Sequence, residues 1–214
     1  MADIIPLAIA IAASPFPVIP AILLLFTPQA RRSASAFLLG WFAGVALVTA
    51  VFVAVADVIE LLDEPPAWAS WVRIAAGAGL LIWGVRHWLG RKAVKPAPAW
   101  MASISSAGPR KAARLALLLS AANPKIVLLA AAGGLAIGAE TTGLTAQAIG
   151  VLAFALVGSI SVAIPVMGFL IAGDRVLRPL GIARDWLELN NAAVMAVVFI
   201  VLGIVLLVKG ITAL

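Results

Sequence analysis

Residues 119–125 read Leu-Ser-Ala-Ala-Asn-Pro-Lys, and the last three of them interrupt an apolar run that extends from Leu115 to Ile137. Proline removes a backbone donor from a helix, and a lysine at the depth of a bilayer centre is a charge without water. The first apolar run has a similar interruption, Ser-Pro-Phe-Pro at residues 14–17, and an Ala-Ala pair precedes both interruptions. Two broken helices at corresponding positions of two halves are typical of the midplane binding sites of transporters.

The composition indicates a polytopic membrane protein. Of the 214 residues, 64% are hydrophobic and 11% are charged, and the mean hydropathy is +1.16. A soluble domain of this size has too little interior to bury so many apolar side chains. The chain has no cysteine and one histidine, which excludes thiol chemistry and leaves little material for imidazole chemistry. The pI near 10.8 comes from basic residues beside apolar runs, which favours binding to anionic lipid head groups over nucleic acid.

Six apolar runs predict six transmembrane helices, at residues 4–26, 36–56, 71–88, 115–137, 144–172 and 192–208. The first run is not expected to be a cleaved signal peptide, because Asp3 stands where basic residues belong and the run contains prolines. The fifth run is over-long and contains Pro165, which predicts a kink or a tilt there.

The charges between these runs predict the orientation of the chain. The first, third and fifth connections and their edges hold most of the basic residues: Arg31, Arg32, Arg86, Arg91, Lys92, Lys95, Arg110, Lys111, Arg114, Arg175, Arg178 and Arg184. The other connections hold Asp57, Glu60, Asp63, Glu64 and Glu140. By the positive-inside rule, the odd-numbered connections face the cytoplasm and both termini are extracytoplasmic.

A long basic connection divides the chain into a first set of three spans (residues 1–90), a linker (residues 91–113) and a second set of three spans (residues 114–214). Because each set has an odd number of spans, the second set enters from the opposite side. The expected fold is therefore an all-α membrane protein with six transmembrane helices in an inverted three-plus-three repeat, in which helices 1 and 4 are broken. Weak sequence matches support the repeat: Gly40 with Gly150, and residues 79–82 (Gly-Leu-Leu-Ile) with residues 203–206 (Gly-Ile-Val-Leu).

The polar connections have different predicted structures. Residues 92–98 are basic and rich in proline, which predicts an extended, solvated tether. Residues 99–114 contain Trp100 and end in basic residues, which predicts a short interfacial helix, either a plain linker or a docking surface for lipid head groups. Residues 173–191 mix both signs of charge, which predicts a salt-bridged surface.

The candidate site consists of the residues at the two interruptions: Ser14, Pro15, Pro17, Asn123, Pro124 and Lys125. The prolines should free the carbonyls near Ile11, Ala13 and Ser120 from their helical donors. In lipid, freed carbonyls need partners, so both breaks should face the protein interior, with Ser14 and Asn123 supplying polar groups. Lys125 would pair with a substrate anion, with carbonyls or with an acidic residue.

A purely structural interpretation of these residues stays open. Proline kinks are common in membrane helices, and a shallower Lys125 would snorkel toward the head groups. Ser159 and Ser161 either line a cavity or bond to carbonyls of their own helix. Six glycines are expected to be helix contacts rather than site residues: Gly77, Gly79, Gly133, Gly134, Gly138 and Gly158.

Three of these stretches together resemble a known family. The Ser-Pro-Phe-Pro break, residues 37–41 (Phe-Leu-Leu-Gly-Trp) and residues 119–125 are similar to the GAP family, the glycopeptidolipid- and sulfolipid-addressing proteins of the lysine-exporter (LysE) superfamily. The resemblance covers essentially the whole chain. It implies six helices in an inverted repeat, a plasma-membrane location and movement of lipids or glycolipids toward the cell surface, with the six candidate residues as the core of the site. Amino-acid exporters of the superfamily have a glycine-rich first motif instead of Ser-Pro-Phe-Pro, which disfavours amino-acid substrates.

The sequence is compatible with three functions. The first is a transporter or flippase for a lipid, glycolipid or similar amphiphile. The second is an exporter of amino acids or small metabolites, and the third is a non-transporting accessory subunit of a lipid-export machine. A lipid carrier should have a cavity with a side opening and a polar floor at Asn123. A small-solute exporter should have a closed polar cavity, and an accessory subunit needs none.

Other classes are disfavoured by what the sequence lacks. It has no recognisable nucleophile, carboxylate pair or metal cluster, so we expect neither an enzyme nor a cofactor. Metal export is disfavoured because it needs acidic or imidazole ligands inside the membrane, whereas Asp57 is expected near the outer end of its run and His87 at the cytoplasmic rim. The expected partners are membrane lipids, an amphiphilic substrate, a second copy in a homodimer favoured by small-residue faces, and, for an accessory role, a larger lipid-export complex. Nucleic acid is not among them.

Overall fold

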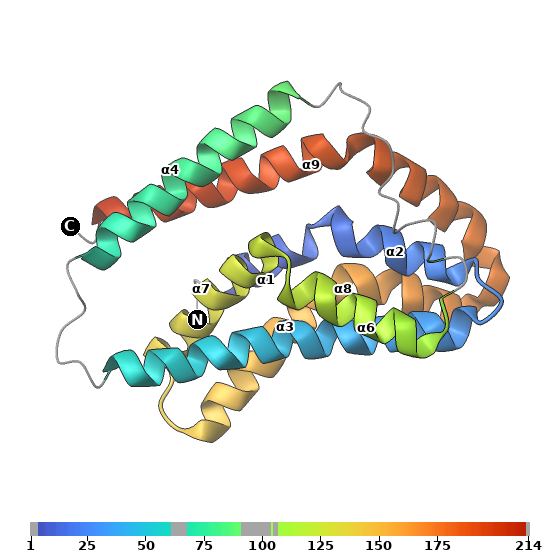
Figure 1. Ribbon diagram of the computed structural model, residues 1–214, viewed down its shortest axis with the longest axis horizontal. Helices are drawn as coiled ribbons and strands as arrows, with labels where there is room; N and C mark the ends of the chain where they lie inside the picture. The colour runs from blue at the N-terminus through green and yellow to red at the C-terminus, as the bar shows by residue number, and fades with distance from the viewer. Residues whose placement is uncertain (1–3, 61–67, 91–103, 105–106, 213–214) are drawn as a thin grey trace.

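The computed structural model describes residues 4–60, 68–90, 104 and 107–212, and the regular secondary structure of these residues is entirely helical. A 3₁₀ turn, η1, covers Gly173–Val176. The α-helices are α1 (Ile4–Ala12), α2 (Pro15–Leu25), α3 (Ala30–Glu60), α4 (Trp68–Leu89), α6 (Pro109–Ala121), α7 (Pro124–Glu140), α8 (Leu144–Ala172) and α9 (Leu177–Thr212) (Figure 1). The predicted tether, residues 92–98, and residues 99–103, 105 and 106 of the predicted interfacial helix lie outside the described residues.

The helices follow the apolar runs of the sequence. Two continuous segments are long and apolar enough to cross a membrane, Ala30–Val58 and Leu144–Asn190, with mean hydropathies of 2.4 and 2.3. The pair α1–α2 is bent by 45° and the pair α6–α7 by 67°, and each pair adds one further candidate span if it crosses as a unit. The described residues therefore contain two to four candidate spans, as expected of a multi-pass membrane protein.

Two helices begin earlier than the hydropathy of the sequence predicts. The connection expected at residues 173–191 is helical, because η1 leads directly into α9. Part of the predicted charge pairing is present: Arg184 contacts Asp185 at 2.7 Å and Glu188, one turn further along the helix, at 3.2 Å. Pairs at this spacing support an exposed helix, so α9 extends well beyond its apolar part. Likewise α6 begins at Pro109, and its first turn carries the basic residues that were expected at the end of the linker.

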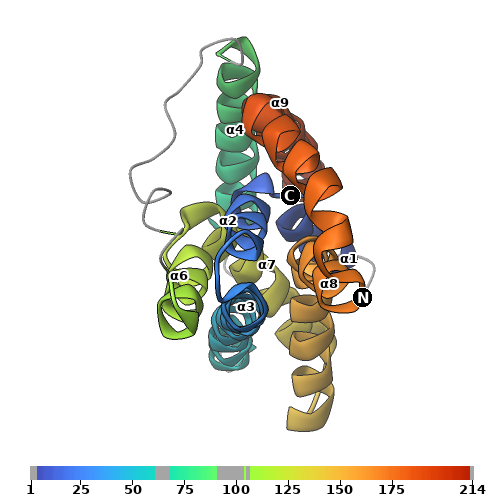
Figure 2. The same ribbon diagram turned by 90° about the vertical axis from the view of Figure 1, so that its right-hand side faces the viewer.

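Helices from the two halves of the chain pack against each other. Helix α3 packs mainly against α6 and α7, whereas α8 packs against α3 and also against α1 and α2. Helices α4 and α9 pack against each other as an antiparallel pair, which Figures 1 and 2 show beside the remaining helices. Each half thus places its second long helix against the bent pair of the other half.

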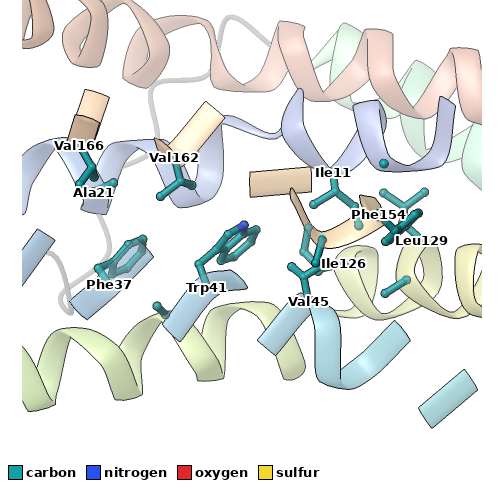
Figure 3. Close-up of a cluster of buried hydrophobic side chains, with 14 of the residues drawn as sticks. Ile11, Ala21, Phe37, Trp41, Val45, Ile126, Leu129, Phe154, Val162 and Val166 are labelled. Carbon is teal, nitrogen blue, oxygen red and sulfur yellow. The ribbon is translucent and has the colours of Figure 1, made fainter. Parts of the chain in front are cut away.

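Trp41 lies at the centre of the hydrophobic core and is completely buried (Figure 3). Its indole Nε1 donates to the Gly158 carbonyl oxygen at 3.5 Å, which ties α3 to α8. The other labelled core residues come from both halves: Ile11, Ala21, Phe37, Val45, Ile126, Leu129, Phe154, Val162 and Val166. Outside this core many large apolar side chains are exposed, such as Ile171 at 81% and Leu39 at 68%, as a lipid-facing surface requires.

Glycines let the helices approach closely, as the sequence predicts for all but one of them. A Cβ atom on Gly134 would meet the Thr49 carbonyl oxygen, and a Cβ atom on Gly77 would lie 2.9 Å from the Gly203 carbonyl oxygen. Gly133, Gly138 and Gly158 also face neighbouring side chains. The prediction was wrong for Gly79, which has no such neighbour within 4 Å among the described residues.

Candidate functional site

The first helix break has Ser14 as the N-cap of α2. Its backbone is extended, with φ −74° and ψ 120°, and Pro15 opens the helix. The Ser14 amide donates to the Ile11 carbonyl oxygen at 3.0 Å, so the prediction of a free carbonyl at Ile11 was wrong. The chain closes one tight turn here instead of leaving the helix end open. Ser14, Pro15 and Pro17 are all buried, as expected for a break that faces the interior.

The second break repeats this local structure. Asn123 is the N-cap of α7, with φ −81° and ψ 114°, and Pro124 follows it as Pro15 follows Ser14. The Asn123 side-chain Oδ1 accepts from the Lys125 amide at 3.1 Å, and the Asn123 carbonyl accepts from the Val127 amide at 2.9 Å. The side chain of Asn123 therefore caps the start of α7. Pro124 is exposed, so this break lies nearer the surface than the first.

The two breaks converge on one residue of α9. The Ser14 hydroxyl lies 4.0 Å from Met195 Sδ, and Lys125 Nζ donates to the same sulfur at 3.5 Å. Lys125 Nζ also lies 5.5 Å from the centroid of the Phe199 ring. Met195 and Phe199 are four residues apart and so share one face of α9. Of the six predicted site residues, the structure brings Ser14 and Lys125 together in this way.

The charge of Lys125 has unusual surroundings. Among the described residues, no carboxylate lies within ion-pair distance of its Nζ atom, and its partners are a thioether and an aromatic face. Both are weak compared with a carboxylate, because sulfur is a poor acceptor and ring attraction is modest. Of the three partners expected for Lys125, the structure therefore supplies no acidic residue. A half-buried cation without an anion is suited to attract one.

The aromatic residues around Phe199 were not predicted. Its ring stacks on Trp83, with centroids 5.5 Å apart and an angle of 16° between the planes. The His87 ring lies 5.7 Å from Phe199 and 6.4 Å from Trp83. The cluster joins α4 to α9 beside Lys125. The only signal in the sequence was the four-residue spacing of Met195 and Phe199 within a uniformly apolar run.

Two hydroxyls on α8 are left without partners. Ser159 Oγ and Ser161 Oγ are both buried and make no hydrogen bond within the described part of the chain. Neither serine bonds to a carbonyl of its own helix, so that alternative was wrong. The buried hydroxyls of Thr49 and Ser120, by contrast, donate to carbonyls of their own helices at 2.8 Å and 3.0 Å.

Two open hollows lie at opposite ends of the molecule, away from both breaks. One of about 670 Å³ lies where α2 turns into α3, and one of about 380 Å³ lies between α3 and α8 near Asp57 and Gln147. Neither is lined by Asn123, Ser14 or Lys125. The cavity expected above Asn123 is therefore not one of these two. The described residues include no group of three His, Cys, Asp or Glu side chains that could hold a metal ion.

Comparison with known proteins identifies the family of the chain. No curated protein and no solved structure matches the chain. A family model described as Sap, sulfolipid-1-addressing protein, matches residues 4–212, which include both helix breaks and all of α9. Since that match extends over nearly the whole sequence, the chain belongs to the sulfolipid-1-addressing protein family.

Proposed function

We propose that this protein moves a lipid, a glycolipid or a similar amphiphile across the plasma membrane, and that the two helix breaks form its midplane site. The observation that carries the proposal is the convergence of Ser14 and Lys125 on Met195. Helix α2 has 11 residues. At about 1.5 Å per residue it extends about 16 Å from Ser14 to its far end, which is half of a hydrocarbon core of about 30 Å.

An inverted repeat of three plus three helices accounts for the symmetry of the breaks. Both N-caps have nearly the same backbone angles, and both are followed directly by proline. The exchange of α3 and α8 between the bent pairs is the packing that a twofold axis in the membrane plane would produce. In this arrangement α4 and α9, the third helix of each half, would be symmetry mates.

The chemistry of the site favours an anionic or strongly polar head group. Lys125 supplies a positive charge with no carboxylate partner in the described part of the chain, and Ser14 supplies a hydroxyl with only a distant sulfur beside it. A head group would replace Met195 as their partner, while the thioether and the Phe199 ring would remain against its apolar part. Rocking of one repeat against the other would carry the head group between the two sides.

The proposed orientation places the basic end in the cytoplasm and both termini outside. The Ser33 hydroxyl donates to the Ala107 carbonyl oxygen at 3.0 Å, which holds the starts of α3 and α6 together. Arg31 and Arg110, near these starts, therefore share one end of the molecule with η1 (Figure 1). Cysteine labelling tests this orientation, because the chain has no cysteine of its own. A single cysteine in place of Arg110 should react with an impermeant maleimide only from the cytoplasmic side. A single cysteine in place of Thr141 should react only from the outside.

Reconstitution tests the proposal directly. Liposomes that contain a fluorescent anionic lipid are prepared with the wild type, with Asn123→Ala or with Lys125→Ala, and transbilayer movement is followed by reduction of the outer-leaflet label. We expect movement above that of empty liposomes for the wild type, and its loss in both variants. Equal movement in all three proteins would overturn the assignment of the site.

A second candidate is a non-transporting accessory subunit of a lipid-export machine, because neither hollow is lined by residues of the breaks. It predicts no movement by the purified wild type and recovery of movement only with a partner. An exporter of amino acids or small metabolites is less well supported, because both hollows are open rather than closed. In each case we propose a carrier or a helper rather than an enzyme.

A further inference from the structure

The hollow of about 670 Å³ lies at the basic end of the molecule, where three segments meet. It is lined by the turn from Leu25 to Arg32, by Phe169 near the end of α8, and by Asp174 and Leu177 at the start of α9. Figure 2 looks onto this end of the molecule, where α2, α3, α8 and α9 lie. No residue of either helix break takes part, so the hollow is separate from the proposed midplane site.

The charge around the hollow is positive and unpaired. Arg31 and Arg32 both line it and are exposed, and within the described residues no carboxylate lies at ion-pair distance from either guanidinium. Asp174 is the single carboxylate among the lining residues. Two cations against one anion leave a net positive charge, and guanidinium groups match the planar oxygen pairs of phosphate and sulfate groups.

Backbone donors add to this charge. The Ala30 amide donates to the Thr27 carbonyl at 3.1 Å, and the Ser33 amide donates to the Gln29 carbonyl at 2.9 Å. The amides between them, at Arg31 and Arg32, lie in the first turn of α3, where no helical acceptor exists. They sit at the positive end of a helix of 31 residues, beside the two guanidinium groups of the same residues.

The opposite wall of the hollow is apolar. Leu25 and Phe169 are buried beneath it at 2% and 5% exposure, whereas the Phe26 ring is 50% exposed. A free inorganic anion gains nothing from such a wall. An amphiphile would place its charged group on the arginines and the first carbons of its apolar part on Phe26 and Leu177.

We infer that this hollow binds the phosphate or sulfate head group of an anionic membrane amphiphile at the basic end of the protein. A head group held there lies one helix length, α2, from Ser14. Its use as the loading site for transport rests on the proposed function, but the binding itself does not.

Calorimetric titration of the purified protein in an uncharged detergent tests this binding without any transport. The probes are a short-chain phosphatidic acid, a phosphatidylcholine of the same chain length and inorganic phosphate. We expect the phosphatidic acid to bind at least tenfold more tightly than either of the others, with an affinity that falls as salt is added. Equal binding of phosphatidylcholine, or of inorganic phosphate, would overturn the inference.

Two variants locate the site. Arg31→Gln combined with Arg32→Gln should weaken binding of the phosphatidic acid at least tenfold, and replacing both residues with Lys should restore part of it. The matched control is Arg110→Gln, an exposed arginine at the same end that does not line the hollow. An equal loss in the control would indicate diffuse attraction to the basic end and refute the site. Failure of the proposed function would appear separately, as unchanged lipid movement in Asn123→Ala.

Discussion

Replacing Lys125 with methionine should abolish lipid movement without destabilising the protein. The variant removes the positive charge and keeps a long, unbranched side chain beside Met195 and Phe199. If Lys125 served only to hold helices together, losing it would loosen α7 from α9. If it serves to attract a head group, the fold should not depend on it.

The contacts of Lys125 determine how much the Lys125→Met substitution changes the stability of the protein. A lysine at the centre of a membrane helix costs about 2.5–3.5 kcal/mol to insert. The Phe199 ring, 5.5 Å from Nζ, offsets about 0.5–2 kcal/mol of this cost. The 3.5 Å contact with Met195 Sδ adds little, because a thioether is a weak acceptor. The balance favours methionine by about 0.5–3 kcal/mol. Since 1 kcal/mol shifts the Tm by about 2–4 °C in proteins of this size, the Tm should not fall.

The assay pairs two measurements on the same preparations. Thermal unfolding in detergent, followed by tryptophan fluorescence, gives the Tm of the wild type, of Lys125→Met and of Lys125→Arg. Reconstituted liposomes give the rate of lipid movement for each. We expect the methionine variant to be stable and inactive and the arginine variant to retain part of the activity. A Tm lowered by more than about 4 °C in Lys125→Met, equivalent to roughly 1–2 kcal/mol, would refute the reasoning, because it would make Lys125 a structural residue.

Three further predictions concern the framework of the site, and each is measured as a change in Tm. Gly134→Ala should destabilise the protein by about 1–3 kcal/mol, because its Cβ atom would meet the Thr49 carbonyl and lie 2.8 Å from Phe52 Cβ, whereas Gly79→Ala, with open space around it, should be tolerated. Equal effects of the two would contradict the packing of α7 on α3. Asn123→Ala should lower the free energy of unfolding by about 1 kcal/mol, because the side chain no longer accepts a hydrogen bond from the Lys125 amide. Asn123→Ser should recover most of this loss. An unchanged Tm in the alanine variant would argue against the cap. Trp41→Phe should lower the free energy of unfolding by about 0.5–1.5 kcal/mol, because it removes the hydrogen bond to Gly158. Trp41→Ala should lower it by about 3–5 kcal/mol, because it also leaves a cavity. Similar losses in the two variants would contradict a packing role for Trp41.

The helix breaks could be predicted because proline acts locally. Pro15 and Pro124 each end a helix just before themselves, whatever the rest of the fold does, and the residue before each becomes an N-cap. The detail of each break depends on its neighbours, and for that reason the Ile11 carbonyl was wrongly predicted to be free. The Ser14 amide reaches it through a turn that the sequence does not specify.

The contact of Met195 with both helix breaks could not be predicted, because it depends on how helices that are distant in the sequence pack together. Met195 lies 181 residues from Ser14 and 70 from Lys125, in a run where every neighbour is apolar. Hydropathy alone does not distinguish a methionine that faces a lysine from one that faces lipid. The early start of α9 was missed for a related reason, since paired charges such as Arg184 and Glu188 stabilise a helix without making it hydrophobic.

If a head group replaces Met195 as the partner of Ser14, the first break and α9 must separate during lipid movement, and a reversible cross-link tests this requirement most directly. Because the natural chain has no cysteine, Ser14→Cys combined with Met195→Cys introduces the only two thiols. Ser14 Oγ lies 4.0 Å from Met195 Sδ, and the sulfur of a cysteine at 195 lies nearer the backbone than Sδ, so a short bis-methanethiosulfonate reagent is used to bridge the pair. The two single-cysteine variants treated with the same reagent serve as controls. We predict that cross-linking of the double variant stops lipid movement in liposomes and that reduction restores it. Movement at an unchanged rate in the fully cross-linked protein would contradict the proposed site.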